Sequence, residues 1–534
     1  MSEYVSALMV CQQPVNLLLI VAMVSLGIVF GAIPGLSATL GIALLLPVTF
    51  GLSTETSFVL LLAIWIGGVS GTFISAVLIG IPGSSSAIAT CFDGFPMTKN
   101  GQASKALGIG MTASFIGTVG SAALATVLSP VIAEFALHLG PWEYFSLCFC
   151  AITLVASLSK GNIFKGIMAA GIGLLMGCIG MDPINGSNRF TFGNVYLSSG
   201  ISTVAQMLGM FAMCQIIRDS ARGEAMMPEA DMVNMKGLGI GIRDILQNIK
   251  TIAFAFVSGL WIGFLPGMGS GISNMVAYGY AKSISKEPES FGKGNPAGVW
   301  ASETANNASL GGALIPMMAL GIPGDGITAM LIAGLTIHGL QAGPLFMTEQ
   351  PDLTMLIFAC VMVAAIVTYI VQIIGKRWFP YILKVPYHYL YTVILVICYI
   401  GGYGISNTMF NIYVMLALCL LAIFMSMSGL PTSPLVLAFI LSSKLERYFR
   451  QGISYAHGSY KEFFTRPLSC ALLLVSVFCV VWPLLSEHLK KKKAEAAVPA
   501  AFFFFRCSDK SGQTTQNTET SSRAQESGRV KNSL

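Results

Sequence analysis

The segment LIGIPGSSSAIATCFDGFPMTK, residues 78–99, carries the signal on which the predicted fold depends. An apolar run meets the sequence Ile-Pro-Gly at residues 81–83, and three serines follow directly at 84–86. Pro82 has no amide hydrogen to donate and Gly83 tolerates backbone angles that other residues avoid, so we expect a helix to break here. In a bilayer, non-helical backbone is tolerated only where it is buried in protein or lines a wet cavity. The serines are therefore predicted to lie beside a cavity.

A second copy of this break occurs in the other half of the chain, at residues 321–328 (GIPGDGIT). An earlier pair of segments, residues 31–35 (GAIPG) and 263–267 (GFLPG), shares the pattern G-x-x-P-G. Each half thus carries the same two breaks in the same order, which predicts an internal repeat. Broken helices at matching positions of two halves are the best sequence indication of a transporter's binding site.

The composition is that of a membrane protein. Of the 534 residues, 54% are hydrophobic and 10% are charged, whereas about 25% of residues are charged in an average soluble protein. No Lys or Arg precedes Lys99. Apolar runs of about 20 residues, each long enough to cross a bilayer, recur along the chain, so we expect an all-α, polytopic integral membrane protein with about 10–12 spans in contact with membrane lipid. The net charge of +6 is small and gives no indication of a nucleic-acid partner.

The charged loops predict how the two halves are oriented. The loop after the break at Pro82 contains Lys99 and Lys105, whereas its counterpart at residues 341–352 contains no Lys or Arg. The first-half loop at residues 48–56 also contains no Lys or Arg, whereas its counterpart in the second half contains three lysines. Basic loops stay in the cytoplasm, so this exchange predicts two inverted-topology repeats with broken or re-entrant helices.

The predicted division of the chain follows from these repeats. Residues 1–217 are the first membrane repeat, 218–250 a cytoplasmic linker and 251–485 the second membrane repeat. Residues 486–534 are expected to be a disordered polar tail. The sidedness of the last spans stays open, because basic residues at 444–450 and again at 490–493 both indicate the cytoplasm although one span separates them.

The breaks also supply the predicted chemistry. The first amides of a helix are unpaired and carry partial positive charge, so broken helices can bind a carboxylate without a permanently buried cation. Backbone amides, hydroxyls and side-chain amides next to the breaks make up the candidate substrate site: Gly35, Ser37, Thr39, Gly83, Ser84, Ser85, Ser86, Asn306, Asn307, Gly324 and Thr328. Carbonyls at half-helix ends and side-chain oxygens suit a coupling cation, Na⁺ or H⁺. The candidate cation ligands are Ser270, Ser273, Asn274 and Asp325.

Structural roles compete with these assignments. Glycine-rich breaks can be packing kinks, and Ser and Thr can bond to their own helix. Asn306 and Asn307 are favoured as functional because paired amides are costly in an apolar helix, and Glu303 is an intramembrane candidate by the same argument. Asp93 is favoured as a loop or cap residue. The scattered histidines and the twelve cysteines predict no metal site, and no cofactor is expected besides the coupling ion.

An enzyme is not predicted. The chain has no H-E-x-x-H pattern and no P-loop, and Ser70 and Ser270 both fail the pattern G-x-S-x-G. Two other classes stay open. A passive anion channel would need no cation site, and a structural membrane subunit would tolerate substitution of its breaks. Uphill uptake that an ionophore abolishes would separate a transporter from a channel.

Four stretches resemble the large membrane subunit of tripartite tricarboxylate transporters, the TctA family: residues 31–47, 81–108, 264–274 and 320–344. The block CFDGFPM within the second stretch is specific, and the similarity covers about residues 17–485. Two departures are the three serines at 84–86, where many members have Thr-Pro-Ser, and Asp325 after the second Pro-Gly. Both departures bear on which anion is carried.

The resemblance implies a secondary active transporter subunit. Such a permease lies in the bacterial inner membrane and imports small carboxylates such as tricarboxylates, coupled to a cation gradient. The resemblance also implies two partners, which are a small membrane subunit of four helices and a periplasmic solute-binding protein that delivers the substrate.

Overall fold

The structure is a computed structural model that describes residues 2–157, 163–182, 184–221, 239–383, 387–404 and 406–482. Within these residues almost every element is a helix, as predicted, and the exception is an antiparallel ladder between β1 (Gly180–Met181) and β2 (Asn188–Arg189). Residues 1–476 form one compact unit, and a second unit that starts at residue 477 is described only to residue 482. The predicted tail and the middle of the predicted linker lie outside the described residues.

The elements before the predicted linker follow one another closely. They are α1 (Ser2–Gln12), α2 (Pro14–Ala32), α3 (Ala38–Leu45), η1 (Leu46–Gly51), α4 (Thr54–Gly71), α5 (Phe73–Leu78), η2 (Ser85–Ala87), α6 (Ile88–Lys99), α7 (Ala103–Leu137), α8 (Pro141–Ser157), α9 (Ile163–Gly177), the two strands, η3 (Val195–Ser199), α10 (Thr203–Met207), the π-helical η4 (Leu208–Met213) and α11 (Cys214–Ala221).

The later elements begin with α12 (Ile242–Gln247). They continue with α13 (Ile249–Phe264), α14 (Gly269–Ile284), η5 (Pro288–Ser290), α15 (Pro296–Leu320), α16 (Gly326–Ile337), α17 (Pro344–Glu349), α18 (Pro351–Gly375), η6 (Lys376–Trp378), α19 (Phe379–Ile382), α20 (Tyr387–Gly404), α21 (Met409–Met427), α22 (Thr432–Tyr455) and α23 (Glu462–Thr465), and a last apolar helix spans Pro467–Trp482.

Five helical stretches in the described residues are long and apolar enough to cross a membrane. They are Pro14–Ala32, Thr54–Leu78, Ala103–Leu137, Pro351–Ile382 and Met409–Met427. Several shorter apolar helices, such as α8, α9, α13 and α16, have 10–17 residues. The predicted total of about 10–12 spans depends on these shorter helices and stays a prediction.

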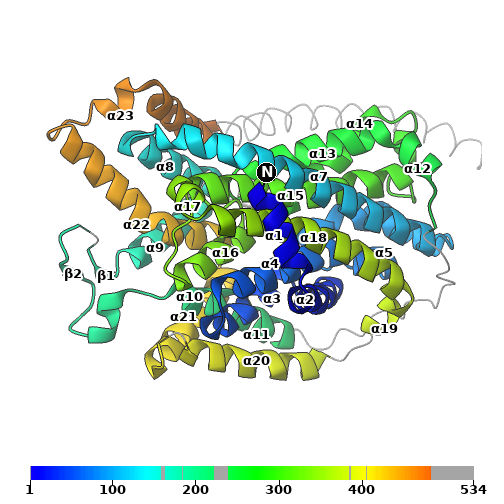
Figure 1. Ribbon diagram of the computed structural model, residues 1–534, viewed down its shortest axis with the longest axis horizontal. Coiled ribbons are helices and arrows are strands. Elements are labelled where there is room, and N and C mark those ends of the chain that lie inside the picture. The colour runs from blue at the N-terminus through cyan, green and yellow to red at the C-terminus, as the bar shows by residue number, and fades with distance from the viewer. Residues whose placement is uncertain are drawn as a thin grey trace, which may run out of the picture. The chain divides into compact units, whose positions relative to one another are not determined.

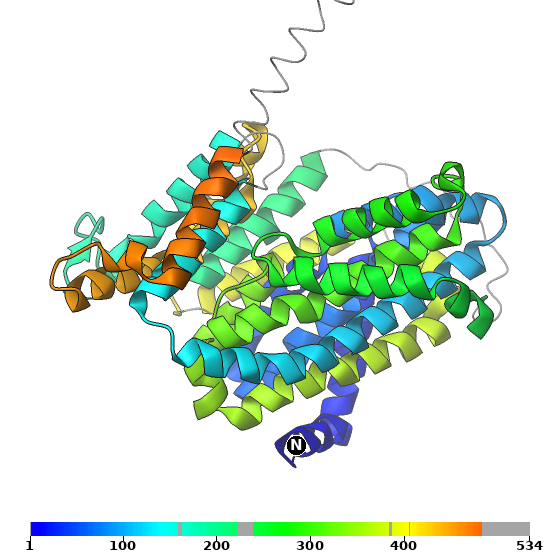
Figure 2. The ribbon, with the colours of Figure 1, turned by 90° about the horizontal axis from the view of Figure 1, so that it is seen from above.

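Helix α15 is the core of the first unit. Each of its residues from Gly298 to Ala319 is buried, and it packs against α6, α7, α13 and α14. Figure 1 and Figure 2 show α7 running beside α15. Because α7 comes from the first predicted half and α15 from the second, the two halves are interleaved and do not form separate lobes.

Glycines allow these helices to approach at backbone distance. A Cβ on Gly117 of α7 would lie 2.6 Å from the carbonyl oxygen of Thr304 in α15. In α13, a Cβ on Gly259 would overlap the carbonyl oxygen of Ala305, and a Cβ on Gly263 would overlap that of Ser309. Small residues in helix interfaces are the usual means of close packing within membranes, where lipid provides little hydrophobic drive for helix association.

A second group of helices, α8, α9 and α22, packs together and is joined to the loop after α9 by ion pairs. Arg450 of α22 donates to Asp182 (2.7 Å) and to Glu446 (2.9 Å), and Arg189 donates to both carboxylate oxygens of Glu446 at 2.8 and 3.0 Å. Two backbone amides and Arg450 hold the pKa of the Asp182 carboxyl below its usual range. These contacts fix the short β-ladder against the C-terminal part of α22.

The contact between α7 and α15 can be tested with Gly117→Ala. The added Cβ meets backbone atoms that cannot rotate away, so we expect a loss of about 1–3 kcal/mol in the free energy of unfolding. The measurement is the thermal melting of the purified full chain in detergent.

The matched control for this test is Gly279→Ala in α14, where a Cβ would meet nothing within 4 Å. This helical substitution should leave the melting temperature unchanged or raise it slightly, because Ala favours helices by about 0.5–1 kcal/mol over Gly. Equal melting of the two variants would show that α7 and α15 do not depend on this close approach.

Candidate functional site

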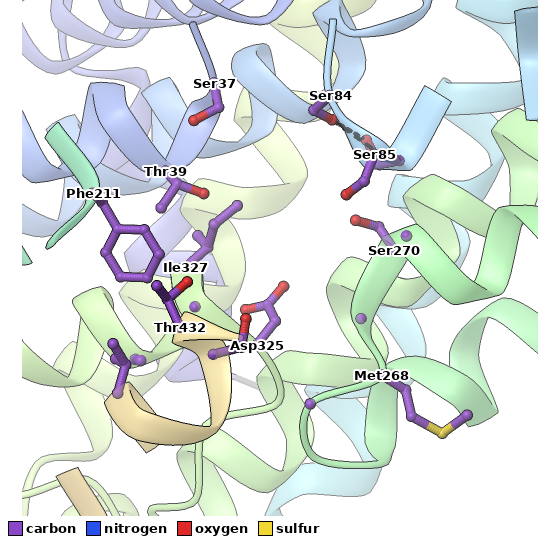
Figure 3. A pocket seen from close by; sticks show the side chains of 18 of the residues that line it. Ser37, Thr39, Ser84, Ser85, Phe211, Met268, Ser270, Asp325, Ile327 and Thr432 are labelled. Atoms are coloured by element: carbon purple, nitrogen blue, oxygen red, sulfur yellow. Dashed lines mark hydrogen bonds between the residues drawn. The ribbon is translucent and has the colours of Figure 1, made fainter. Parts of the chain in front are cut away.

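A cavity of about 570 Å³ lies where the predicted breaks meet. All four breaks contribute lining residues, and in Figure 3 Ser37, Thr39, Ser85, Ser270 and Asp325 surround the same space. Ser84 and Ser86 also line it. The cavity therefore brings together predicted substrate ligands from residues 37–39 and 84–86 with two of the four predicted cation ligands.

The first break leads from α2 to α3. Helix α2 ends at Ala32, and Gly35 adopts a φ of +91°, a conformation that favours glycine. Ser37 is the N-cap of α3 and accepts a hydrogen bond from the amide of Leu40 (3.2 Å). Ser37 and Thr39 line the cavity, whereas Gly35 forms the turn behind them.

The second break leads from α5 through η2 into α6. Ser84 caps η2 by accepting from the amide of Ser86 (3.3 Å), and the two hydroxyl oxygens lie 2.7 Å apart. Gly83 donates its amide to the carbonyl of Thr72 (3.3 Å), and a Cβ at Gly83 would overlap the carbonyl oxygen of Gly31. Gly83 thus lies behind the lining, where it joins the second break to the first.

The third and fourth breaks also contact each other. Gly267 has a φ of +77° and donates its amide to the carbonyl of Gly324 (2.6 Å). Asp325 is the N-cap of α16: its Oδ1 accepts from the amide and the hydroxyl of Thr328, both at 2.8 Å. A Cβ on Gly269 would lie 3.7 Å from Asp325 Oδ2, so this second oxygen faces the start of α14. Gly324 and Thr328 therefore support Asp325 from behind the cavity wall.

The other two predicted cation ligands lie one layer deeper. Asn274 donates to the carbonyl of Ser85 (3.2 Å) and to that of Ser270 (3.1 Å), and its buried Oδ1 has no partner within the described structure. Ser273 donates to the carbonyl of Ala305 (3.2 Å) in α15. Neither side chain lines the cavity, and both hold α14 against its neighbours.

Asn306 and Asn307 lie away from the cavity, in contrast to the predicted substrate contact. Both are fully buried in α15. Asn307 accepts from Ser70 (2.8 Å) and Thr118 (3.2 Å) and donates to Ser114 (2.8 Å). The cost of a side-chain amide in an apolar helix is thus offset by neighbouring hydroxyls of α4 and α7.

Asp93 lies inside helix α6 and not in a loop, and its carboxylate caps the segment before α15. Its Oδ1 accepts backbone amides of Gly292 (2.8 Å), Gly294 (2.9 Å) and Asn295 (2.8 Å), in the segment before α15. The carboxylate therefore ties α6 to the start of the central helix.

Two parts of the cavity wall were not predicted from the sequence. Residues 429–433 (GLPTS), between α21 and α22, form a further interruption that contributes Thr432 and Ser433. The Gly-x-Pro spacing there was an available signal. Phe211 also lines the cavity, from the π-helical turn η4, and no sequence pattern indicated it.

These features define a class of protein: a polytopic helical membrane protein whose helices break around an internal cavity, as in secondary transporters. The chain belongs to the tripartite tricarboxylate transporter TctA family, which residues 17–437 match. It is therefore a component of a membrane transporter and not an enzyme, and the family confirms the resemblance found in the sequence.

Two relatives from Agrobacterium vitis are similar to the chain. An uncharacterized 52.8 kDa protein in the TAR-I ttuC' 3' region is 32% identical over 479 residues, which cover 90% of this chain and 95% of the relative. An uncharacterized protein in the TAR-II ttuC' 3' region is 30% identical over 234 residues, which cover 44% of this chain and 97% of the relative. No solved structure is significantly similar to the chain.

The position of Asn307 predicts a structural phenotype for Asn307→Leu. The substitution leaves hydroxyls of Ser70, Ser114 and Thr118 without this partner, and each unsatisfied buried group costs about 1–3 kcal/mol. We expect a clearly lower melting temperature for the full chain in detergent. Ser85→Ala is the control, because Ser85 is exposed to the cavity, and it should melt like the wild type. Wild-type melting of Asn307→Leu would contradict this assignment.

Proposed function

We propose that the chain imports a small di- or tricarboxylate through this cavity, coupled to a cation gradient. The observation that supports it best is a convergence of helix starts. Helices α3, α14, α16 and α22 begin at the cavity, as does the turn η2 that leads into α6. Their first amides carry partial positive charge, while no Lys or Arg is among the lining residues. Amides and hydroxyls can thus hold a carboxylate without a buried basic side chain.

Asp325 supports the coupling to a cation. It is the acidic residue of the lining, and both hydrogen bonds from Thr328 go to its Oδ1. A bare carboxylate at this position would repel an anionic substrate. A cation held by Asp325, the Ser270 hydroxyl and nearby carbonyls would remove the repulsion, so each solute would favour binding of the other.

Matching contacts in the two halves support an internal repeat. In α2, Cβ atoms on Gly27 and Gly31 would meet the carbonyl oxygens of Ile64 and Gly68 in α4. In α13, Cβ atoms on the corresponding glycines 259 and 263 would meet the carbonyl oxygens of residues 305 and 309 in α15. The α2–α4 pair and the α13–α15 pair therefore pack through the same positions relative to their breaks.

Ion pairs also favour one orientation for the last spans. Arg450 contacts Asp182 after α9, and Arg466 contacts Glu143 near the start of α8 (3.4 Å). If Lys99 is cytoplasmic and α7 crosses the membrane, these ends are periplasmic. On this assignment the end of α22 that carries Arg450 is periplasmic, in contrast to the cytoplasmic side that its basic residues indicate in the sequence.

The partners follow from the tripartite family. A tripartite transporter has other subunits, and we propose a small four-helix membrane protein and a periplasmic solute-binding protein, both acting at the bacterial inner membrane. A passive anion channel is less well supported, because it gives no role to the Asp325 carboxylate in the cavity wall. A structural subunit is less well supported because five interruptions meet at one space.

The test of this function is uptake of labelled di- and tricarboxylates by proteoliposomes that contain the full chain and its partner subunits. Uphill uptake should require a cation gradient and stop when an ionophore abolishes that gradient. The double variant Ser84→Ala/Ser85→Ala should raise the apparent KM for the carboxylate about ten- to hundredfold, since a hydrogen bond to a charged group contributes about 1.5–3 kcal/mol. Asp325→Asn should weaken the dependence of uptake on the cation gradient by at least tenfold.

The matched control is Ser25→Ala, because the Ser25 hydroxyl donates to the Val21 carbonyl of its own helix (2.7 Å). This variant should transport like the wild type. Uptake that continues downhill without any cation gradient, or a double serine variant with wild-type KM, would contradict the proposed site.

A further inference from the structure

Glu303 is a fully buried carboxylate that lies outside the cavity wall. It lies in the N-terminal part of α15 with no exposed surface, and it forms no ion pair within the described residues. It is also the only charged residue of α15. The fold therefore buries an acidic group without a basic partner.

The helices packed around Glu303 supply no cation. Ionisable groups that face this region are Cys91 and Asp93 of α6 and Tyr278 of α14, none of which is basic. The basic residues of these helices lie at their ends: Lys99 of α6, Lys105 of α7, Lys250 of α13 and Lys282 of α14. Thr90 and Ser114, which contact Glu303, are about 13 Å along their helices from Lys99 and Lys105. An ionised carboxylate in such a place is costly unless a cation or a proton neutralises it.

The hydrogen bonds around Glu303 favour the protonated acid. Ser302 donates its single hydroxyl hydrogen to the carbonyl of Gly298 (2.9 Å), so its oxygen accepts from Thr90 (2.9 Å). Thr90 then has no hydrogen left for Glu303 Oε1, with which it is in direct hydrogen-bond contact. All three contacts are satisfied at once only if Glu303 carries a proton and donates it to Thr90.

The same groups suit a metal cation poorly. The other oxygen of Glu303 faces donors, the Ser114 hydroxyl and the Asn306 amide nitrogen, both at 3.4 Å. Na⁺ needs several oxygen lone pairs directed at one point, whereas a proton needs one acceptor. The direct contact of Thr90 with Glu303 also leaves no space for an ion between them.

We propose that Glu303 is a proton-binding site that is loaded and unloaded during transport, so that H⁺ is a coupling ion. Its role in coupling rests on the proposed function. Thr90 follows Ser86 of the cavity wall by four residues, about one helical turn, so Glu303 lies one side-chain layer behind the cavity. When the side chains between Glu303 and the cavity move apart, a hydronium ion in the cavity transfers its proton to Glu303 Oε1 and leaves as water. The reverse transfer on the other side of the membrane releases the proton.

The proton itself can be tested without transport. The infrared spectrum of the purified full chain in lipid at neutral pH should contain the carbonyl stretch of a buried carboxylic acid. Glu303→Gln should lose this band. Thr90→Val should shift the band, because the hydrogen bond that the acid donates to Thr90 is removed. Glu134→Gln, at an exposed position of α7, is the control and should keep the band. A band that persists in Glu303→Gln, or is absent in the wild type, would overturn the proposal.

The coupling role is tested in proteoliposomes with the partner subunits. Glu303→Gln mimics the protonated side chain but cannot release a proton. We expect at least a tenfold loss of carboxylate accumulation driven by a pH gradient, with exchange of labelled for unlabelled carboxylate retained. Glu134→Gln should keep both activities.

Three results of this assay are decisive. Accumulation by Glu303→Gln that still follows the pH gradient would overturn the proposal, and so would wild-type uptake driven by Na⁺ with no response to pH. A wild type that carries no carboxylate at all would contradict the proposed function, and the infrared result would still decide whether Glu303 binds a proton.

Discussion

Backbone groups freed at helix breaks must find partners inside the protein, because lipid offers none. This requirement organises the molecule. The amide of Gly83 is paired with the carbonyl of Thr72, and the amide of Gly267 with the carbonyl of Gly324. The first pairing ties the second break to the junction of α4 and α5, and the second pairing ties the third break to the fourth. The breaks consequently have to lie together, and the cavity forms where their remaining amides and hydroxyls meet.

The same requirement explains why the centre of the protein is polar and yet closed. The helix α15 carries Glu303, Asn306 and Asn307 through a region with no exposed surface. Glycines bring α7 and α13 to backbone distance of this helix, so hydroxyls of neighbouring helices can reach its side chains. Close packing and satisfied hydrogen bonds are thus one arrangement, since a wider helix separation would leave the buried amides unpaired.

Much of the cavity could be predicted from sequence, because Pro and Gly act on local backbone geometry. Helices end before Pro82-Gly83 and Pro323-Gly324, and the adjacent serines and Asp325 cap the helices that follow. The position of Asn306 and Asn307 could not be predicted in this way. The cost of an amide in an apolar helix is offset equally by a ligand or by hydroxyls of another helix, and only the fold shows which is present. Phe211 could not be predicted either, because it belongs to a segment that is distant in sequence and that only the fold brings to the cavity.

The carboxylates of Asp325 and Glu303 differ in what can reach them. Asp325 lies at a helix start beside a space of about 570 Å³, and its second oxygen is directed at that space, so a cation with part of its hydration shell has room there. Glu303 is enclosed by Thr90, which accepts its proton, and by Ser114 and Asn306, whose hydrogens point at its other oxygen. These partners stabilise a carboxylic acid, but they do not direct several oxygen lone pairs at one point, as a metal ion needs. The difference between the two environments therefore selects the size of the ion: a hydrated cation fits the open carboxylate, and a proton alone fits the closed one.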